Sequence, residues 1–142
     1  MTDIALVAAK IARIHPDRDE VYDLIAGATI TTGQTVAIVI ATGKVSPGDG
    51  NAGGNLDQPR GVALNGGAAG QVISVLKRGY CAGYTVASVA YDALLYQSDT
   101  AGAIADAAGT VSAIVGRVVP MTDASLTKVV YFDFKWAIAN FS

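Results

Sequence analysis

Residues 60–79 have the sequence RGVALNGGAAGQVISVLKRG, and this stretch decides the expected fold. A short apolar segment follows a glycine, small residues then make a turn, and a second apolar segment returns. This order is typical of a β-hairpin. The pattern recurs near the C-terminus, where the apolar residues 115–120 precede a polar turn and an alternating segment at 127–136. The chain is therefore expected to be organised around two similar hairpins.

The composition favours a β-rich domain of small side chains. Of the 142 residues, 51% are hydrophobic but only 7% are aromatic, and 16 are glycine. A chain of this length buries about two thirds of its unfolded surface in one core, which indicates a single domain. Apolar segments are short and turns recur about every 8 to 12 residues, as in all-β domains. We predict an all-β fold, a small β-barrel or sandwich.

A repeat divides the chain into two similar β-modules. Gly61 and Gly116 occupy matching positions and lie 55 positions apart. We predict an internal duplication over about 28–79 and 83–136, inside one domain at 21–142. A solenoid would need three or more copies, so two copies indicate one closed unit. The two glycines are expected where a strand bends or another backbone comes close.

The last strand has one strongly aromatic face. Its even-numbered residues are Val130, Phe132, Phe134 and Trp136. Packing in the core is the simplest interpretation of this face. The alternative is that Trp136 and the nearby Phe141 lie in a subunit interface, because aromatic residues anchor such contacts.

Residues 1–20 differ in composition from the rest of the chain. Eight of the 22 charged residues lie in the first 23 positions. We predict an N-terminal arm over residues 1–20, either extended or a short amphipathic helix, because apolar residues recur there at helical spacing and Pro16 would end a helix. The apolar residues at this spacing are Ile4, Val7, Ile11 and Ile14.

The only histidine, His15, lies among charged residues of this segment. Acid/base catalysis would need two groups held in a cleft with different pKa values, so the acids near Pro16 are expected to form a solvated link. These acids are Asp17, Asp19, Glu20 and Asp23. We expect His15, Arg13 and Arg18 to contact another subunit. The candidate residues for contacts with a partner protein or between subunits are Ile11, Arg13, His15, Arg18, Trp136 and Phe141.

Charge and hydropathy argue against two classes of partner. A net charge of −2 provides no positive surface for a phosphate backbone, so nucleic acid is not expected as a partner. The longest apolar run, residues 36–41, is too short to cross a bilayer, and the N-terminus lacks the basic segment of a signal peptide. The single cysteine, Cys81, cannot form an intrachain disulfide and is expected to be a buried thiol in a soluble protein.

No motif predicts catalysis or a cofactor. Residues 48–53, GDGNAG, match the glycine fingerprint of dinucleotide-binding loops, but the following residues cannot begin the helix that would hold a pyrophosphate. The same loop resembles one turn of calcium-binding glycine-rich repeats, which share each ion between stacked copies. A Gly-x-Ser-x-Gly nucleophile motif is absent from the sequence. We therefore expect no enzyme activity, no cofactor and no bound metal.

Four segments resemble, in their order and spacing, the capsid decoration (cement) proteins of tailed bacteriophages. They are residues 13–34, 60–65, 91–102 and 115–119. The resemblance implies a β-barrel-like body of the β-tulip type that assembles as a homotrimer on the outer capsid surface of the virion. It also implies that an N-terminal arm lies over neighbouring major capsid protein subunits and clamps them. Residues 1–20 are the matching segment.

The expected function is therefore structural stabilisation of a capsid, with the major capsid protein and copies of the chain itself as partners. The alternative is a β-barrel module that binds a carbohydrate or a host surface, as in a head fibre. In that case four tyrosines would be exposed and could stack on sugars, whereas the simpler interpretation is that these tyrosines lie at strand ends and pack and hydrogen-bond locally. They are Tyr80, Tyr84, Tyr91 and Tyr96.

Overall fold

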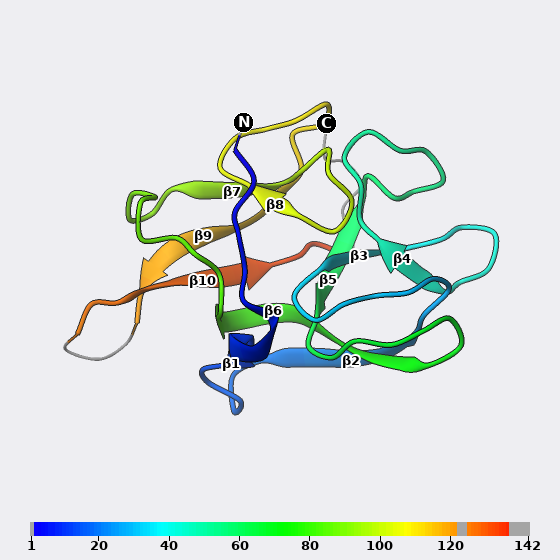
Figure 1. Ribbon diagram of the computed structural model, residues 1–142, viewed down its shortest axis with the longest axis horizontal. Helices are drawn as coiled ribbons and strands as arrows, with labels where there is room; N and C mark the ends of the chain where they lie inside the picture. Colours follow the sequence, from blue (N-terminus) through cyan, green and yellow to red (C-terminus); the bar gives the residue numbers. More distant parts are fainter. Residues whose placement is uncertain (1, 122–124, 137–142) are drawn as a thin grey trace.

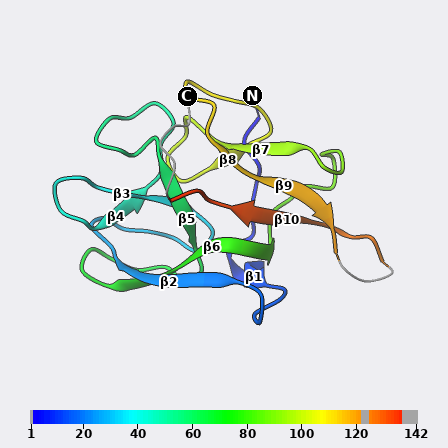
Figure 2. The same cartoon turned by 180° about the vertical axis from the view of Figure 1, so that it is seen from behind.

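Figures 1 and 2 show the computed structural model, which describes residues 2–121 and 125–136. The chain is all-β, as predicted, and the only helix in these residues is the three-residue 3-10 helix η1. No helix in this part of the chain is long and apolar enough to cross a membrane. The elements are η1 (Ala8–Lys10), β1 (Ala12–Arg13), β2 (Glu20–Ile25), β3 (Thr35–Ile38), β4 (Val45–Pro47), β5 (Pro59–Ala63), β6 (Val72–Ala82), β7 (Leu94–Gln97), β8 (Ile104–Ala105), β9 (Ile114–Pro120) and β10 (Lys128–Asp133).

The strands form one sheet that curls into a half-barrel (Figure 1). Its order is β4-β3-β5-β6-β10-β9-β7-β8, while β1 and β2 also pair with β6. Neighbouring strands in this order are antiparallel. The hairpin expected at residues 60–79 is formed by β5 and β6, which pair at Val62 and Leu76. Strand β6 is the longest and joins the two parts of the sheet.

The sheet consists of two halves of four strands each, and the strands follow the same order in both halves, counted outward from the centre of the sheet. One half contains β6, β5, β3 and β4, the other contains β10, β9, β7 and β8, and β6 pairs with β10 between them. In the first half Gly61 lies opposite Val36, and the register shifts immediately after that pair. In the second half Gly116 lies opposite Leu95, and the register shifts at the same place. The halves therefore share both a topology and a β-bulge.

The two glycines lie where a side chain has no space. A Cβ atom at Gly61 would lie 2.8 Å from the carbonyl oxygen of Leu76, and one at Gly116 would collide with the carbonyl oxygen of Tyr131. Because a backbone carbonyl cannot move aside without breaking the strand pairing, both positions require glycine. The close backbone approach expected from the sequence is confirmed at both sites.

Two hydrophobic clusters form the core. The larger contains Phe132, Phe134 and Val130 from the even-numbered face of β10, which confirms the expected core packing of these three residues. The smaller lies in the first half and includes Val36, Val45 and Val75. The buried Cys81 belongs to the larger cluster, and burial raises the pKa of its thiol to about 12. The expectation of a buried thiol is confirmed.

The N-terminal segment is extended and lies across its own body (Figure 1, dark blue). Asp3 and Leu6 form isolated β-bridges with Ala105 and Tyr84, and the amide of Ile4 donates to the carbonyl of Ile104 at 2.8 Å. The helix suggested by the apolar spacing is wrong beyond the single turn of η1, because strand partners satisfy the backbone. Ile4 is buried in the larger core, so this segment contributes to the hydrophobic core.

Substitution of Gly116 by alanine will destabilise the fold, because the added methyl group meets a paired backbone. We expect Gly116→Ala and Gly61→Ala each to lower the free energy of unfolding by about 1–3 kcal/mol. A methyl group added at Gly53 would have no other atom within 4 Å, so this position serves as the control. Gly53→Ala should leave stability within about 0.5 kcal/mol of the wild type in urea denaturation. Equal stability of Gly53→Ala and Gly116→Ala would refute the steric explanation.

Truncation of Ile4 tests whether the N-terminal segment is part of the core. Ile4→Ala should cost about 2–4 kcal/mol, because it empties a buried site, whereas Val7, which is 46% exposed, provides the control. Thermal unfolding of Val7→Ala should match that of the wild type. If Ile4→Ala is also neutral, residues 2–7 do not stabilise the body.

Candidate interaction surface

The candidate interface residues predicted from the sequence lie in two separate places. Ile11 is half-buried and packs against the larger core. Trp136 is half-buried and follows β10, which ends at Asp133. Its Nε1 donates to the carbonyl of Arg60 at 2.7 Å, and its ring centroid lies 4.9 Å from that of Tyr22. Phe141 lies outside the described residues. Trp136 therefore has both a core-packing role and contacts near the surface.

Arg13, His15 and Arg18 lie together around the turn that joins β1 and β2. The ring of His15 meets the ring of Tyr80 edge-on, with centroids 5.1 Å apart, and Tyr80 lies 5.1 Å from Tyr131. These three rings form an aromatic stripe across β6 and β10. Arg18 is exposed and lines a hollow of about 350 Å³ that also contains Tyr80 and Tyr131.

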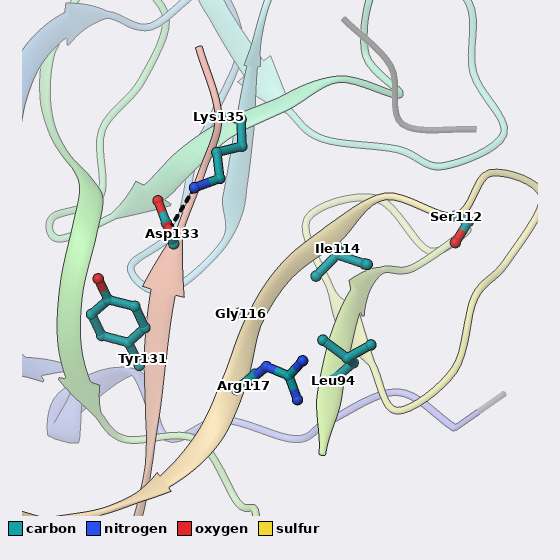
Figure 3. A pocket seen from close by; sticks show the side chains of 8 residues that line it. All are labelled: Leu94, Ser112, Ile114, Gly116, Arg117, Tyr131, Asp133 and Lys135. Carbon is teal, nitrogen blue, oxygen red and sulfur yellow. Dashed lines mark hydrogen bonds and ion pairs between the residues drawn. The ribbon is translucent and has the colours of Figure 1, made fainter. Parts of the chain in front are cut away.

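A second hollow continues from Tyr131 across β10, β9 and β7 (Figure 3). Its volume is about 460 Å³, and we call it the β9 groove. It is lined by Leu94, Ser112, Ile114, Gly116, Arg117, Tyr131, Asp133 and Lys135. The Nζ of Lys135 pairs with Asp133 at 2.7 Å, as the dashed line in Figure 3 marks, and Arg117 donates to the carbonyl of Asp92 at 2.6 Å. Since Tyr131 borders both hollows, they form one continuous outer face.

The β9 groove was not predicted as a site from the sequence. The alternation in the last strand does place Tyr131, Asp133 and Lys135 together on its odd-numbered face, so part of the signal was present. The sequence pattern does not show the strand pairing that brings Arg117 and Leu94 beside Tyr131. These contacts depend on strand order, which a single sequence does not specify.

Asp19 differs from the solvated acid expected at this position. Its side chain is fully enclosed, its Oδ2 lies 3.9 Å from the Nε of Arg13, and neither carboxylate oxygen has a hydrogen bond of good geometry within the described residues. Gly79, with φ +150°, leaves the space for this carboxylate, because a Cβ there would collide with it. Burial raises the pKa of Asp19 above its usual value, although Arg13 and His15 act in the opposite direction.

The neighbouring Glu20 is paired and half-exposed. It contacts Lys77 at 3.2 Å and also pairs with Arg78. The hydrogen bond from Lys77 lowers the pKa of Glu20. Within residues 2–121 and 125–136, no group of three or more His, Cys, Asp or Glu side chains is placed to hold a metal ion. Glu20, and Asp23 through a hydrogen bond from the hydroxyl of Ser74 at 3.2 Å, link β2 to β6.

The tyrosines proposed for sugar stacking have different surroundings. Tyr84 is buried, and its hydroxyl donates to the carbonyl of Gly33 at 2.7 Å, which confirms the simpler interpretation of local packing and rules out sugar stacking by this ring. Tyr80 is half-buried beside His15, and Tyr96 is half-buried in β7. Tyr91 is 50% exposed and borders a separate apolar hollow.

The raised pKa of Asp19 predicts a specific pH dependence. A carboxyl group whose pKa is higher in the folded state than in the unfolded state binds more protons when folded, so its contribution to stability rises as the pH falls through the folded pKa toward 3.8. We expect the wild type to gain stability relative to Asp19→Asn as the pH is lowered from 7 to 4. Asp17→Asn, at an exposed position, is the matched control. A constant difference between wild type and Asp19→Asn in urea denaturation across this range would contradict the assignment.

Comparisons with known proteins do not assign this chain to a family. No family model matches the sequence, and no curated protein and no solved structure is significantly similar to it.

Proposed function

We propose that this protein is a non-catalytic decoration protein that binds the outer surface of a bacteriophage capsid and stabilises the shell. The proposal starts from the resemblance of residues 13–34, 60–65, 91–102 and 115–119 to capsid decoration proteins. Its partners would be the major capsid protein and further copies of this chain, as a homotrimer on the virion surface. The all-β body is compatible with this role.

The observation that carries the proposal is the continuous outer face. Its two hollows carry an aromatic stripe beside Arg18 and Arg117, and aromatic residues and arginine are enriched in protein–protein interfaces. The turn between β1 and β2 brings His15 and Arg18 to the edge of this face. A clamp needs such extended contacts, because many weak contacts repeated over a symmetric shell give high avidity.

The packing of residues 2–14 changes which part of the N-terminal region would contact the capsid. Ile4 is buried in the core of its own chain, and the half-buried Ile11 packs against that core. Arg18 is exposed at the tip of the following turn, and its guanidinium forms no ion pair with any described residue. We therefore assign the capsid contact to the turn at residues 14–19 rather than to a free arm.

One observation favours the alternative of a carbohydrate- or host-surface-binding module. Tyr91 is half-exposed and lies against an almost wholly apolar hollow lined by Val118, Pro120 and Leu126. An exposed ring beside an apolar surface can stack on a sugar. Binding to a glycan array that is lost in Tyr91→Ala, without any binding to capsids, would favour this alternative.

Co-sedimentation with expanded capsid shells that lack decoration protein tests the proposal. The wild type should pellet with the shells, and Arg18→Glu should lower the apparent affinity about tenfold, because it reverses a charge at the contact. Lys44→Glu makes the same change at an exposed residue far along the sheet and should bind as the wild type does. Equal binding of both variants would show that the turn at residues 14–19 does not contact the capsid. Failure of the wild type to pellet would overturn the proposed function.

A further inference from the structure

The outer face of the second half corresponds to a face that is covered in the first half. In the first half, Thr35, Val62 and Leu76 lie side by side on β3, β5 and β6, and all three are fully buried. In the second half, the residues that occupy the same places beside the bulge are Leu94, Arg117 and Tyr131. All three line the β9 groove. One copy of the repeated surface is thus closed, and the other is open.

The cover of the closed surface comes from the other half of the repeat. Val62 and Leu76 pack in one cluster with Leu95 of β7, and the Oγ1 of Thr35 donates to the Oε1 of Gln97 at 2.6 Å. The first half is therefore covered by protein of this same chain. Nothing in the described part of the chain covers the open groove, where Ile114 is 41% exposed.

The lining of the β9 groove has two cationic side chains and one carboxylate, although the protein as a whole is acidic. It contains Arg117 and Lys135, and its one carboxylate, Asp133, is already paired with Lys135. The nearest carboxylate to Arg117 is that of Asp92, at 3.5 Å and largely in solvent. A surface ion pair of this kind contributes little and is easily exchanged. The groove therefore favours a partner that carries carboxylates.

The same chain presents a group of carboxylates without cations. Between Gly79 and Gly116 the sequence contains no lysine or arginine. We call the carboxylates around the turn between β7 and β8 and the adjoining N-terminus the acidic end; they are Asp3, Asp49, Asp99 and Asp106. None of them forms an ion pair with a described residue.

Hydrogen bonds hold the acidic end together and leave its charge in place. The hydroxyl of Ser98 donates to Asp3 at 2.5 Å, the amide of Thr110 donates to Asp99 at 2.9 Å, and the amide of Thr2 donates to Asp106 at 2.8 Å. Asp3 and Asp106 are exposed. Complementary charges on two patches of one molecule favour association between copies.

We propose that the β9 groove binds the acidic end of a second copy of this chain. The apolar side chains of Leu94 and Ile114 would be covered by the neighbour, and Arg117 and Lys135 would meet its carboxylates. This inference rests on the self-assembly part of the proposed function and names the surfaces that would carry it.

The test is the mass in solution, measured by sedimentation velocity over a range of protein concentrations. The wild type should self-associate, and association should weaken as salt is raised from about 50 mM to about 500 mM because the contact is charged. Ile114→Glu should raise the dissociation constant about tenfold or more. Ile40→Glu, the same change at another exposed isoleucine, should leave it unchanged. Circular dichroism of each variant verifies that the fold is retained.

A mixture of two variants distinguishes this contact from one between two grooves. Ile114→Glu has an altered groove and an intact acidic end, whereas Asp106→Lys has the reverse. An equimolar mixture should associate more tightly than either variant alone, because one groove and one acidic end remain matched. A mixture no tighter than the separate variants, or a wild type that stays monomeric, would overturn the inference. A monomer that still pellets with capsid shells would refute only the self-association, and an oligomer that does not pellet would refute only the capsid function.

Discussion

Strand β6 is the element on which the rest of the structure depends. It pairs with the N-terminal strands β1 and β2, with β5 of the first half of the sheet and with β10 of the second half. Its backbone hydrogen bonds therefore join strands from the N-terminal region, the middle and the C-terminal region of the chain. Val75 and Leu76 pair in regular register with Tyr22 and Val21, so these adjacent residues point to opposite faces of the strand, and both are buried. Val75 belongs to the smaller cluster and Leu76 to the larger one. A single strand thus supports two cores on opposite faces.

A register shift in β6 between Leu76 and Arg78 explains where the outer face comes from. Beyond it, Cys81 points into the larger core, while Arg78 and Tyr80 point away from it, in line with Tyr131 and Asp133 of the paired strand. The smaller core covers the opposite side only in the first half of the sheet. The part of β6 and β10 beyond the shift is therefore left with one face in the core and one face open. The aromatic stripe and the β9 groove lie on that open face.

The parts of this fold that local patterns determine could be predicted from the sequence. The hairpin at residues 60–79, the buried even-numbered face of the last strand and the close approach at Gly61 and Gly116 each depend on neighbouring residues or on one spacing. The N-terminal segment could not be predicted in this way. Its apolar residues occur at helical spacing, but Ile4 and Leu6 find partners more than 75 positions away, and these partners decide its extended conformation. The candidate surface could be predicted only in part. His15 and Arg18 were identified from charge, whereas Arg117 reaches Tyr131 through strand order.

The distribution of charge follows from this architecture and bears on how the molecule could assemble. Ion pairs of the described residues lie along β1, β2, β6 and β10 and at Arg117, where cations are available. The carboxylates around β7 and β8 have no such neighbours, because the sequence places no lysine or arginine between Gly79 and Gly116. Within one copy these carboxylates are held by hydroxyl and amide donors, which fix their positions but do not neutralise them. Exposed carboxylates without a cation lower the stability of the folded chain only slightly in water. Their electrostatic attraction to a cationic surface favours the approach of such a surface. In an assembly of identical chains that surface is already present in every neighbour, so a charge pattern left unbalanced within one copy can be balanced between copies.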